Sequence, residues 1–221
     1  MKTILEENIS KIEAKLQKAK LIAVTKTKPV PLLLEAYNAG LRRFGENKVQ
    51  EMVEKYNQLP ADIEWHLIGH LQTNKVKYMA PFVNYIHSVD SLKLLSEINK
   101  QAAKNERVIN CFLQVFIATE ETKFGLNPTE LLEILESVEL KTFENIKITG
   151  LMGMASNTDD DQKIASEFEN LKQLFDTLKI KYKTKNIEFE ELSMGMSSDF
   201  EIAIKHGATM VRVGSALFGN R

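Results

Sequence analysis

Residues 21–48 read LIAVTKTKPVPLLLEAYNAGLRRFGENK, and this stretch contains the unit that repeats along the chain. A short apolar run at 21–25 is followed by a segment of helical period at 31–39 and by a second short run at 43–45. Alternation of short apolar runs with longer helical patterns is typical of βα units in a parallel sheet. Gly40, directly after the helical segment, marks the point where a helix commonly ends.

The same alternation continues to the end of the 221 residues. Eight strands are predicted, at residues 21–25, 43–45, 63–68, 85–88, 108–117, 146–152, 187–193 and 209–213. Seven helices are predicted between them, at residues 31–39, 48–58, 74–81, 91–105, 128–138, 160–182 and 198–205. This number of strands favours a closed parallel (β/α)8 barrel, a TIM barrel, over a doubly wound open sheet. We expect one α/β domain over residues 1–221.

An additional helix, at about residues 5–18, is predicted before the first strand. We expect it to cover the surface that a final helix would otherwise occupy, because the chain ends a few residues after the eighth predicted strand. Helix starts are marked by Asp90 or Ser91 and by the pair Asn127 and Pro128.

Composition excludes several classes of protein. Hydrophobic residues make up 43% and charged residues 27% of the chain, which is ordinary for a water-soluble domain. The net charge is −1 and no polybasic segment is present, so nucleic acid and anionic membranes are not expected partners. The first twenty residues lack the apolar core of a secretory signal, and no stretch has the length of a membrane span. Because no signal and no membrane span are predicted, we expect a reducing, cytoplasmic location. The single cysteine, Cys111, lies in an apolar run and has no second cysteine with which to form a disulfide within the chain.

Reactive groups in such a barrel lie at the carboxyl ends of the strands, with phosphate often held after strands seven and eight. The seventh predicted strand runs into SMGMSSD at 193–199 and the eighth into RVGS at 212–215. Glycine allows close approach of an anion, and serine hydroxyls and helix N-termini donate to it. Taken alone, Ser197 or Ser198 reads as a helix cap and Gly214 as a turn. Their pairing on these two strands favours a phosphate site.

The first strand ends in AVTKTKP at 23–29, with Lys26 and Lys28 at the same parity. An ammonium at the end of a buried strand must be paired or neutralised, and a Schiff base with an aldehyde is one means. Parity and spacing leave both lysines open. Pro29 favours departure of the chain from the barrel at Lys28, which makes Lys26 the more interior candidate.

Other candidate residues have two interpretations each. Arg212 either pairs with a carboxylate or faces a bound ligand, and Asn47 either lines the site or caps a helix. His66 either lines the site or is a satisfied interior imidazole, and we favour the second. The remaining histidines, which are His70, His87 and His206, show no spacing with carboxylates or Cys111 that is typical of a metal site, so no metal is predicted.

Six motifs occur in order along the chain: AVTKTKP at 23–29, FGEN at 44–47, WHLIG at 65–69, GLM at 150–152, SMGMS at 193–197 and TMVRVGSALFG at 209–219. Together they resemble the pyridoxal phosphate homeostasis protein family, over essentially the whole chain. The resemblance implies the fold-type III barrel of alanine racemases, with pyridoxal 5'-phosphate (PLP) on Lys26 and Arg212 near the ring nitrogen. It also implies that Asn47 lies close to the cofactor. The residues implied around the phosphate are Ser193, Met194, Ser197, Gly214 and Ser215.

The resemblance also implies a role in cellular PLP supply, as a carrier or regulator of this vitamin B6 cofactor with PLP-dependent apoenzymes as possible recipients. Thr25 and Ser215 stand where the family often has the other hydroxyl residue. A rival function is a PLP-dependent amino-acid racemase, which needs acid–base groups on both faces of the substrate. In alanine racemases a tyrosine from a domain after the barrel supplies the second group, and we expect no such domain here and therefore a monomer. A third possibility is an enzyme that binds a phosphorylated sugar as a Schiff base on Lys26.

Overall fold

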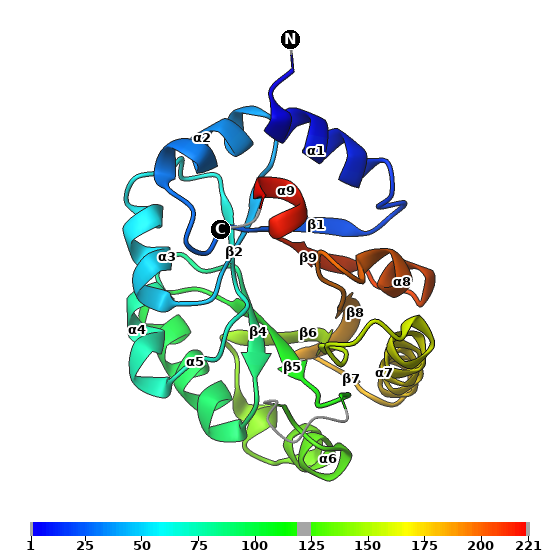
Figure 1. The fold of residues 1–221 in the computed structure, drawn as a ribbon. Coiled ribbons are helices and arrows are strands. Elements are labelled where there is room, and N and C mark those ends of the chain that lie inside the picture. Colours follow the sequence, from blue (N-terminus) through cyan, green and yellow to red (C-terminus); the bar gives the residue numbers. More distant parts are fainter. Residues whose placement is uncertain (1, 119–124, 220–221) are drawn as a thin grey trace.

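The computed structural model describes residues 2–118 and 125–219, and within them eight parallel strands close into a barrel (Figure 1). Each strand pairs with the next along the chain, β6 pairs with β8, and β9 pairs with β1 to complete the ring. The predicted TIM barrel is therefore confirmed. The barrel strands are β1 (Lys20–Val24), β2 (Arg43–Glu46), β3 (Glu64–Leu67), β4 (Tyr85–Val89), β5 (Ile109–Gln114), β6 (Ile146–Met152), β8 (Ile187–Ser193) and β9 (Met210–Val213).

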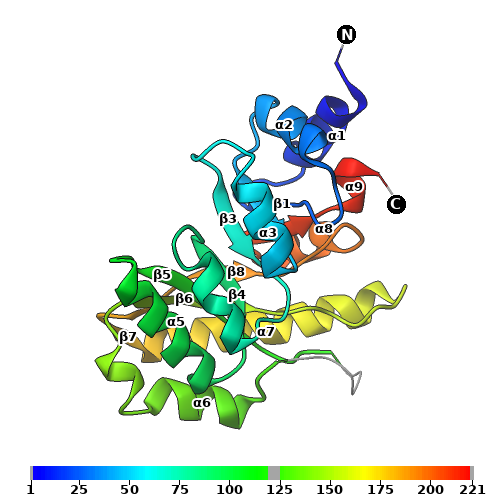
Figure 2. The same ribbon diagram turned by 90° about the vertical axis from the view of Figure 1, so that its left-hand side faces the viewer.

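Helices surround the strands on the outside (Figures 1 and 2). Ser91 caps one of them, and Asn127 forms a capping box at another, because both side chains accept from free backbone N–H groups. The α-helices are α1 (Ile4–Glu13), α2 (Val30–Asn38), α3 (Val49–Tyr56), α4 (Val76–Met79), α5 (Leu92–Lys104), α6 (Pro128–Glu136), α7 (Asp161–Lys181), α8 (Phe200–Lys205) and α9 (Ser215–Phe218). Two 3₁₀ turns, η1 (Thr73–Lys75) and η2 (Leu140–Thr142), accompany them.

Helix α1 occupies the place in the outer ring between α2 and α8, as the sequence predicts (Figure 1). Its apolar side chains Leu5, Ile9 and Ile12 are buried, and the Asn8 amide donates to the Leu217 carbonyl of α9 at 3.0 Å. The helix ends earlier than predicted, at Glu13, and Gln17 adopts a left-handed conformation with φ 53°. The N-terminal helix thus takes the place of a final barrel helix.

The short elements that were not predicted include one strand and one α-helix. Strand β7 (Lys183–Thr184) runs antiparallel to the start of β8, and α9 follows β9. Both are too short for a periodic apolar pattern to be recognised. The fifth predicted strand also ends early, at Gln114, and Val115 then forms an isolated bridge to Leu126.

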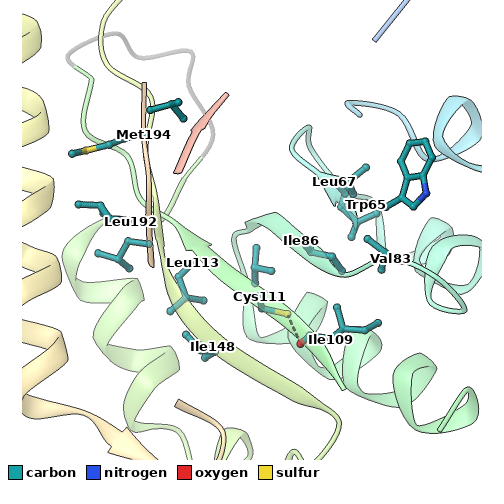
Figure 3. Close-up of a cluster of buried hydrophobic side chains, with 14 of the residues drawn as sticks. Trp65, Leu67, Val83, Ile86, Ile109, Cys111, Leu113, Ile148, Leu192 and Met194 are labelled. Atoms are coloured by element: carbon teal, nitrogen blue, oxygen red, sulfur yellow. Dashed lines mark hydrogen bonds between the residues drawn. The ribbon is translucent and has the colours of Figure 1, made fainter. Parts of the chain in front are cut away.

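The hydrophobic core lies mainly between the strands and the helices. Figure 3 shows part of it, with Trp65, Ile86, Cys111, Leu113 and Met194 directed into this layer. A much smaller apolar cluster of Ile22, Phe112, Met152 and Met210 lies separately from it. Alternate residues of each strand face opposite sides of the sheet, so the outer layer is apolar while the interior also accepts polar side chains. Within the described residues, no helix has the length and apolar character needed to cross a membrane.

Gly150 is required where β6 meets β8. A Cβ atom at this position would lie 1.7 Å from the carbonyl oxygen of Glu191. We expect Gly150→Ala to lower the free energy of unfolding by about 3 kcal/mol, since backbone must move to remove the clash. Urea denaturation monitored by circular dichroism measures this change.

Gly40→Ala is the matched control, because a Cβ there meets no atom within 4 Å and only the positive φ of 104° opposes it. Its expected cost is about 1 kcal/mol. Equal losses in the two variants would contradict the steric explanation.

Candidate functional site

A cavity of about 520 Å³ lies at the carboxyl ends of the barrel strands, within the usual size of a small-molecule site. Its lining comes from the segments that follow β1, β2, β3, β6, β8 and β9. Of the eight residues predicted for the site, six line this cavity: Lys26, Asn47, Ser197, Arg212, Gly214 and Ser215. Segments distant in sequence therefore meet at the predicted end of the barrel.

Ser193 and Met194 do not line the cavity. The Ser193 side chain is fully buried against His87 and Arg212, and Met194 points into the outer hydrophobic layer beside Leu192 (Figure 3). Strand parity explains the second placement, because residues 192 and 194 share the outward face. Met154 lines the cavity although the sequence did not single it out, and Ser198, which the sequence offered as a possible helix cap or phosphate ligand, lines it as well.

The charged residues among the described lining are all cations: Lys26, Lys28 and Arg212. Lys28 Nζ donates to the carbonyls of Phe218, at 3.4 Å, and Gly219, at 3.1 Å. Lys26 Nζ makes no hydrogen bond to another described residue and lines the cavity. These contacts separate the two lysines that sequence spacing could not, since Lys28 ties the C-terminal segment down while Lys26 is left for a ligand.

The segment 25–28, which we call the Lys26 turn, has a constrained backbone. The Lys28 N–H donates to the Thr25 carbonyl at 3.1 Å, and Thr27 adopts a φ of 63°. A left-handed conformation is unfavourable for a β-branched residue and persists only where neighbours hold it. Here Glu51 accepts from the Thr27 N–H at 2.5 Å, and Lys55 Nζ donates to the Thr25 carbonyl at 2.7 Å.

An ion cluster of Glu46, Glu51 and Lys55 therefore supports the Lys26 turn through hydrogen bonds to its backbone. Lys55 Nζ lies 2.6 Å from Glu46 Oε1 and 2.7 Å from Glu51 Oε1, with the side chain of Glu46 fully buried. Burial raises the pKa of Glu46, and the hydrogen bonds from Lys55 and Thr25 offset only part of this effect. Burial also acts to raise the pKa of Glu51, but hydrogen bonds from Lys55 and the Thr27 N–H outweigh it and hold that pKa below its usual value.

Asn47 lies in the cavity wall and does not cap a helix, because the residue before α3 is Lys48. Its backbone packs against Gly69 so closely that a Cβ on Gly69 would lie 2.4 Å from the Asn47 carbonyl oxygen. The Ser88 hydroxyl holds the Gly69 carbonyl at 2.6 Å. The glycine of the WHLIG motif thus allows the chain after β3 to pass close to Asn47.

The loops after β8 and β9 are joined by hydrogen bonds, which agrees with their predicted pairing. Ser197 Oγ accepts from the N–H of Gly214 at 3.1 Å and of Ala216 at 3.4 Å. Ser197 is thus not the cap of α8, which begins after Asp199. Gly195 adopts a φ of 93°, and a Cβ there would lie 2.6 Å from Ala203 Cβ. Together the two loops bring three serines, Ser197, Ser198 and Ser215, to the cavity.

Arg212 forms the base of the cavity, and its hydrogen bonds to described residues go to neutral oxygens. It donates to Ser193 Oγ at 2.7 Å and to the Gly153 carbonyl at 3.1 Å. Burial lowers the pKa of Arg212 to about 10, and the charge of Asp199 opposes this shift. The guanidinium is therefore charged near pH 7 and only partly compensated. Among residues 2–118 and 125–219, no group of three or more His, Cys, Asp or Glu side chains is placed to hold a metal ion.

Comparison with known proteins agrees with the barrel fold and identifies the family. The family model "Alanine racemase, N-terminal domain" matches residues 3–221. A pyridoxal phosphate homeostasis protein of Aquifex aeolicus is 42% identical, with 97% of each chain covered. The chain belongs to the pyridoxal phosphate homeostasis protein family. The structure of PipY from Synechococcus elongatus without PLP has a TM-score of 0.90 at 35% identity, covering 97% of this chain and all of that one. PipY with PLP bound has a TM-score of 0.87 at 34% identity, with the same coverage.

The motifs recognised in the sequence contribute residues to the ion cluster, the cavity and the barrel interior. The FGEN motif contributes Glu46 to the ion cluster and Asn47 to the cavity, and WHLIG places His66 inside the barrel. The sequence carried one signal for the ion cluster, the i,i+4 spacing of Glu51 and Lys55. It carried none for Glu46, whose contact with Lys55 depends on how α3 packs on β2.

We expect Lys55→Met to destabilise the protein by about 3 kcal/mol, because it leaves the carboxylate of Glu46 buried without its cation. Adding Glu46→Gln removes that charge, so the double variant should recover part of the loss. Denaturant titrations of the single and double variants measure both values.

Lys181→Met is the control, since Lys181 pairs with Glu136 at the surface and both side chains are more than half exposed. It should change stability little. A double variant that is no more stable than Lys55→Met would contradict the role given to the unpaired carboxylate.

Proposed function

We propose that this protein binds PLP in the cavity, with Lys26 Nζ as the covalent anchor, and that it carries or regulates the cellular supply of this cofactor. Two findings support the proposal: relatives across nearly the whole chain are named pyridoxal phosphate homeostasis proteins, and PipY has been solved with PLP bound. The observation that carries it for this chain is local. A lysine with no partner among the described residues lines a cavity that is otherwise built for an anion.

The residues present fit PLP, which has an aldehyde on a pyridine ring and a phosphate group. An aldehyde condenses with a lysine amine to a Schiff base and releases water. The hydroxyls of Ser197, Ser198 and Ser215 are suitable donors for a phosphate, and the backbone at Gly214 allows close approach. The cationic lining complements the negative charge of the phosphate. The resemblance implied that Ser193 and Met194 surround the phosphate. In this proposal both residues lie behind the cavity wall.

Each cavity residue has a distinct task in this proposal. Lys26 holds the aldehyde carbon, and the Lys26 turn keeps its Nζ in place. Arg212 faces the ring nitrogen and donates to it without giving up a proton, so the nitrogen stays unprotonated. PLP with a neutral ring is a weak electron sink, which suits a protein that holds the cofactor rather than one that uses it.

The proposal also covers the domain organisation, the location, the oligomeric state and the partners of the protein. We propose that residues 1–221 act as one domain, as a cytoplasmic monomer, and that PLP-dependent apoenzymes receive the cofactor. A lysine imine supports such a transfer, because hydrolysis returns the free aldehyde and the lysine amine, and attack by another amine forms a new imine and frees the lysine.

A racemase would need a second acid–base group opposite Lys26. Among the described residues that line the cavity there is no tyrosine, histidine, aspartate or glutamate. Tyr85, the tyrosine nearest to the barrel interior, begins β4 at the opposite end and stacks on His66 with ring centroids 4.7 Å apart. The cavity thus favours holding PLP over racemisation.

Lys26→Ala should abolish the imine absorbance band of the protein mixed with PLP, because Lys28, the other lysine in the described lining of the cavity, is held by backbone carbonyls. Lys28→Ala is the discriminating variant: its amine holds two backbone carbonyls, so the band should persist. Absorbance spectra, followed by borohydride reduction and peptide mass spectrometry, locate the modified lysine. A band that survives in Lys26→Ala and disappears in Lys28→Ala would reverse the assignment. Absence of any band in the wild type would point to the phosphorylated-sugar alternative.

Solvent deuterium should not enter the α-carbon of L-amino acids at an enzymatic rate in the presence of the PLP-loaded protein. The reason is that PLP with an unprotonated ring nitrogen is a weak electron sink, so it acidifies the α-proton little. Proton NMR of alanine in D₂O measures the exchange, with free PLP as the reference. Rapid exchange that is lost in Lys26→Ala and is accompanied by formation of D-alanine would establish a racemase instead.

A further inference from the structure

A line of polar side chains crosses the interior of the barrel and ends at Arg212. Glu64 Oε1 lies 3.0 Å from His66 Nε2, and His66 Nδ1 lies 2.9 Å from His87 Nε2. His87 Nδ1 lies 2.9 Å from Ser193 Oγ, which accepts from Arg212 at 2.7 Å. His66, His87 and Ser193 are all fully buried. We call these three residues the buried relay.

We propose that the buried relay is a one-directional chain of hydrogen bonds that fixes the guanidinium of Arg212 at the base of the cavity, with both imidazoles neutral and protonated on Nε2. His66, His87 and Ser193 are then positioning residues for Arg212. This inference rests on the proposed function in one respect, that PLP is the ligand which Arg212 contacts.

The direction of the chain follows from its Glu64 end. An ionised carboxylate only accepts, so the proton between Glu64 and His66 belongs to Nε2 of the imidazole. Neutral His66 then has a bare Nδ1, which must accept from Nε2–H of His87. Neutral His87 in turn has a bare Nδ1, which must accept from the hydroxyl of Ser193.

The Arg212 end gives the same direction independently. A guanidinium only donates, so Ser193 Oγ is an acceptor there, and its own proton needs an acceptor elsewhere. Among the described residues, the one remaining hydrogen-bond contact of this hydroxyl is with His87 Nδ1. A buried hydroxyl proton without an acceptor is costly, so Ser193 donates to His87. Both ends thus require one arrangement of protons.

The surroundings keep the two imidazoles neutral. Burial lowers the pKa of His66, and the carboxylate of Glu64 opposes this only in part, while Arg43 and Lys20 add to it. Burial lowers the pKa of His87 well below its usual value, and the neighbouring His66 and Arg212 act in the same direction. An extra proton on His66 Nδ1 would face the N–H of His87, and an extra proton on His87 Nδ1 would face the hydroxyl proton of Ser193. Arg43 holds the far end, since its Nε donates to Glu64 Oε1 at 3.1 Å.

Stacked aromatic rings keep the two imidazoles of the relay in position. His66 stacks on Tyr85, and His87 stacks on Phe112 with ring centroids 4.2 Å apart. Aligned hydrogen bonds polarise one another, which makes Ser193 Oγ a better acceptor for the guanidinium. Arg212 has five N–H groups, and two are bound by Ser193 and Gly153, so its remaining donors are held in a fixed direction for the ligand.

Long-range ¹H–¹⁵N NMR of the wild-type protein without PLP tests the relay directly. We expect both His66 and His87 to show protonation on Nε2 alone and no titration between pH 5 and 9. His70 and His206, which lie outside the barrel, serve as reference imidazoles in the same spectra. Protonation on Nδ1, a mixture of the two forms or titration of either buried histidine would overturn the proposal.

Ser193→Ala tests the effect on Arg212 and removes one hydroxyl only. The Nε2 preference of His87 should weaken, and the dissociation constant for PLP should rise about tenfold. Tyr85→Phe is the matched control: it removes a hydroxyl beside His66 that has no place in the relay, and it should change neither measurement. PLP affinity equal to that of the wild type in Ser193→Ala would overturn the positioning role.

The two measurements also separate this inference from the proposed function. A wild-type protein that binds no PLP refutes the proposed function, whereas the tautomers in the unliganded protein still decide the direction of the relay. If Ser193→Ala fails to fold, the wild-type spectra and the pH series remain decisive.

Discussion

Pairing of β1 with β9 is the contact on which the site depends. It closes the barrel in a register that sets Ile22 opposite Arg212 and Ala23 opposite Val213. Lys26 follows the first of these strands and Arg212 lies on the second, so two residues separated by most of the chain share one cavity. Without this closure the lysine and the guanidinium would lie at the two edges of an open sheet. Parallel pairing between chain ends has a high loop-closure cost, which the apolar layer outside the strands offsets.

Two polar networks then position the reactive groups from opposite sides of the sheet. The cluster of Glu46, Glu51 and Lys55 lies toward α3 and holds the backbone of the Lys26 turn, and the buried relay lies inside the barrel and holds a side chain, that of Arg212. Each network ends at a charged group that forms a further hydrogen bond. Glu51 accepts from the Thr27 N–H, and Arg43 donates to Glu64. Positioning by several hydrogen bonds is more exact than positioning by packing alone, because hydrogen bonds depend strongly on distance and angle.

Sequence reasoning predicted the parts of this protein that repeat. Eight short apolar runs alternate with helical patterns, and this periodicity was sufficient to predict the barrel and the end that carries the site. Six of the residues that line the cavity were predicted from the residue types at the strand ends and from the resemblance to the family. Parity along β8 would also have assigned Met194 to the outer layer. The relay was out of reach, because Glu64, His66, His87 and Ser193 lie on three strands whose relative register no local pattern reveals. The interpretation of His66 as a satisfied interior imidazole is confirmed, and the structure adds what satisfies it.

The polar side chains inside the barrel are better explained by the positioning of Arg212 than by a contribution to the free energy of folding. A TIM barrel is commonly filled with branched apolar side chains, yet the separate apolar cluster here contains only four buried residues, and two histidines, a serine and an arginine lie buried inside. Replacing a buried polar network with well-packed apolar residues is often neutral or stabilising. Retention of this network therefore needs a reason other than folding free energy. A guanidinium that must stay charged in a buried place and point in one direction supplies that reason, since neutral, oriented acceptors such as Ser193 Oγ and the Gly153 carbonyl hold it without a carboxylate that would neutralise its charge toward the ligand.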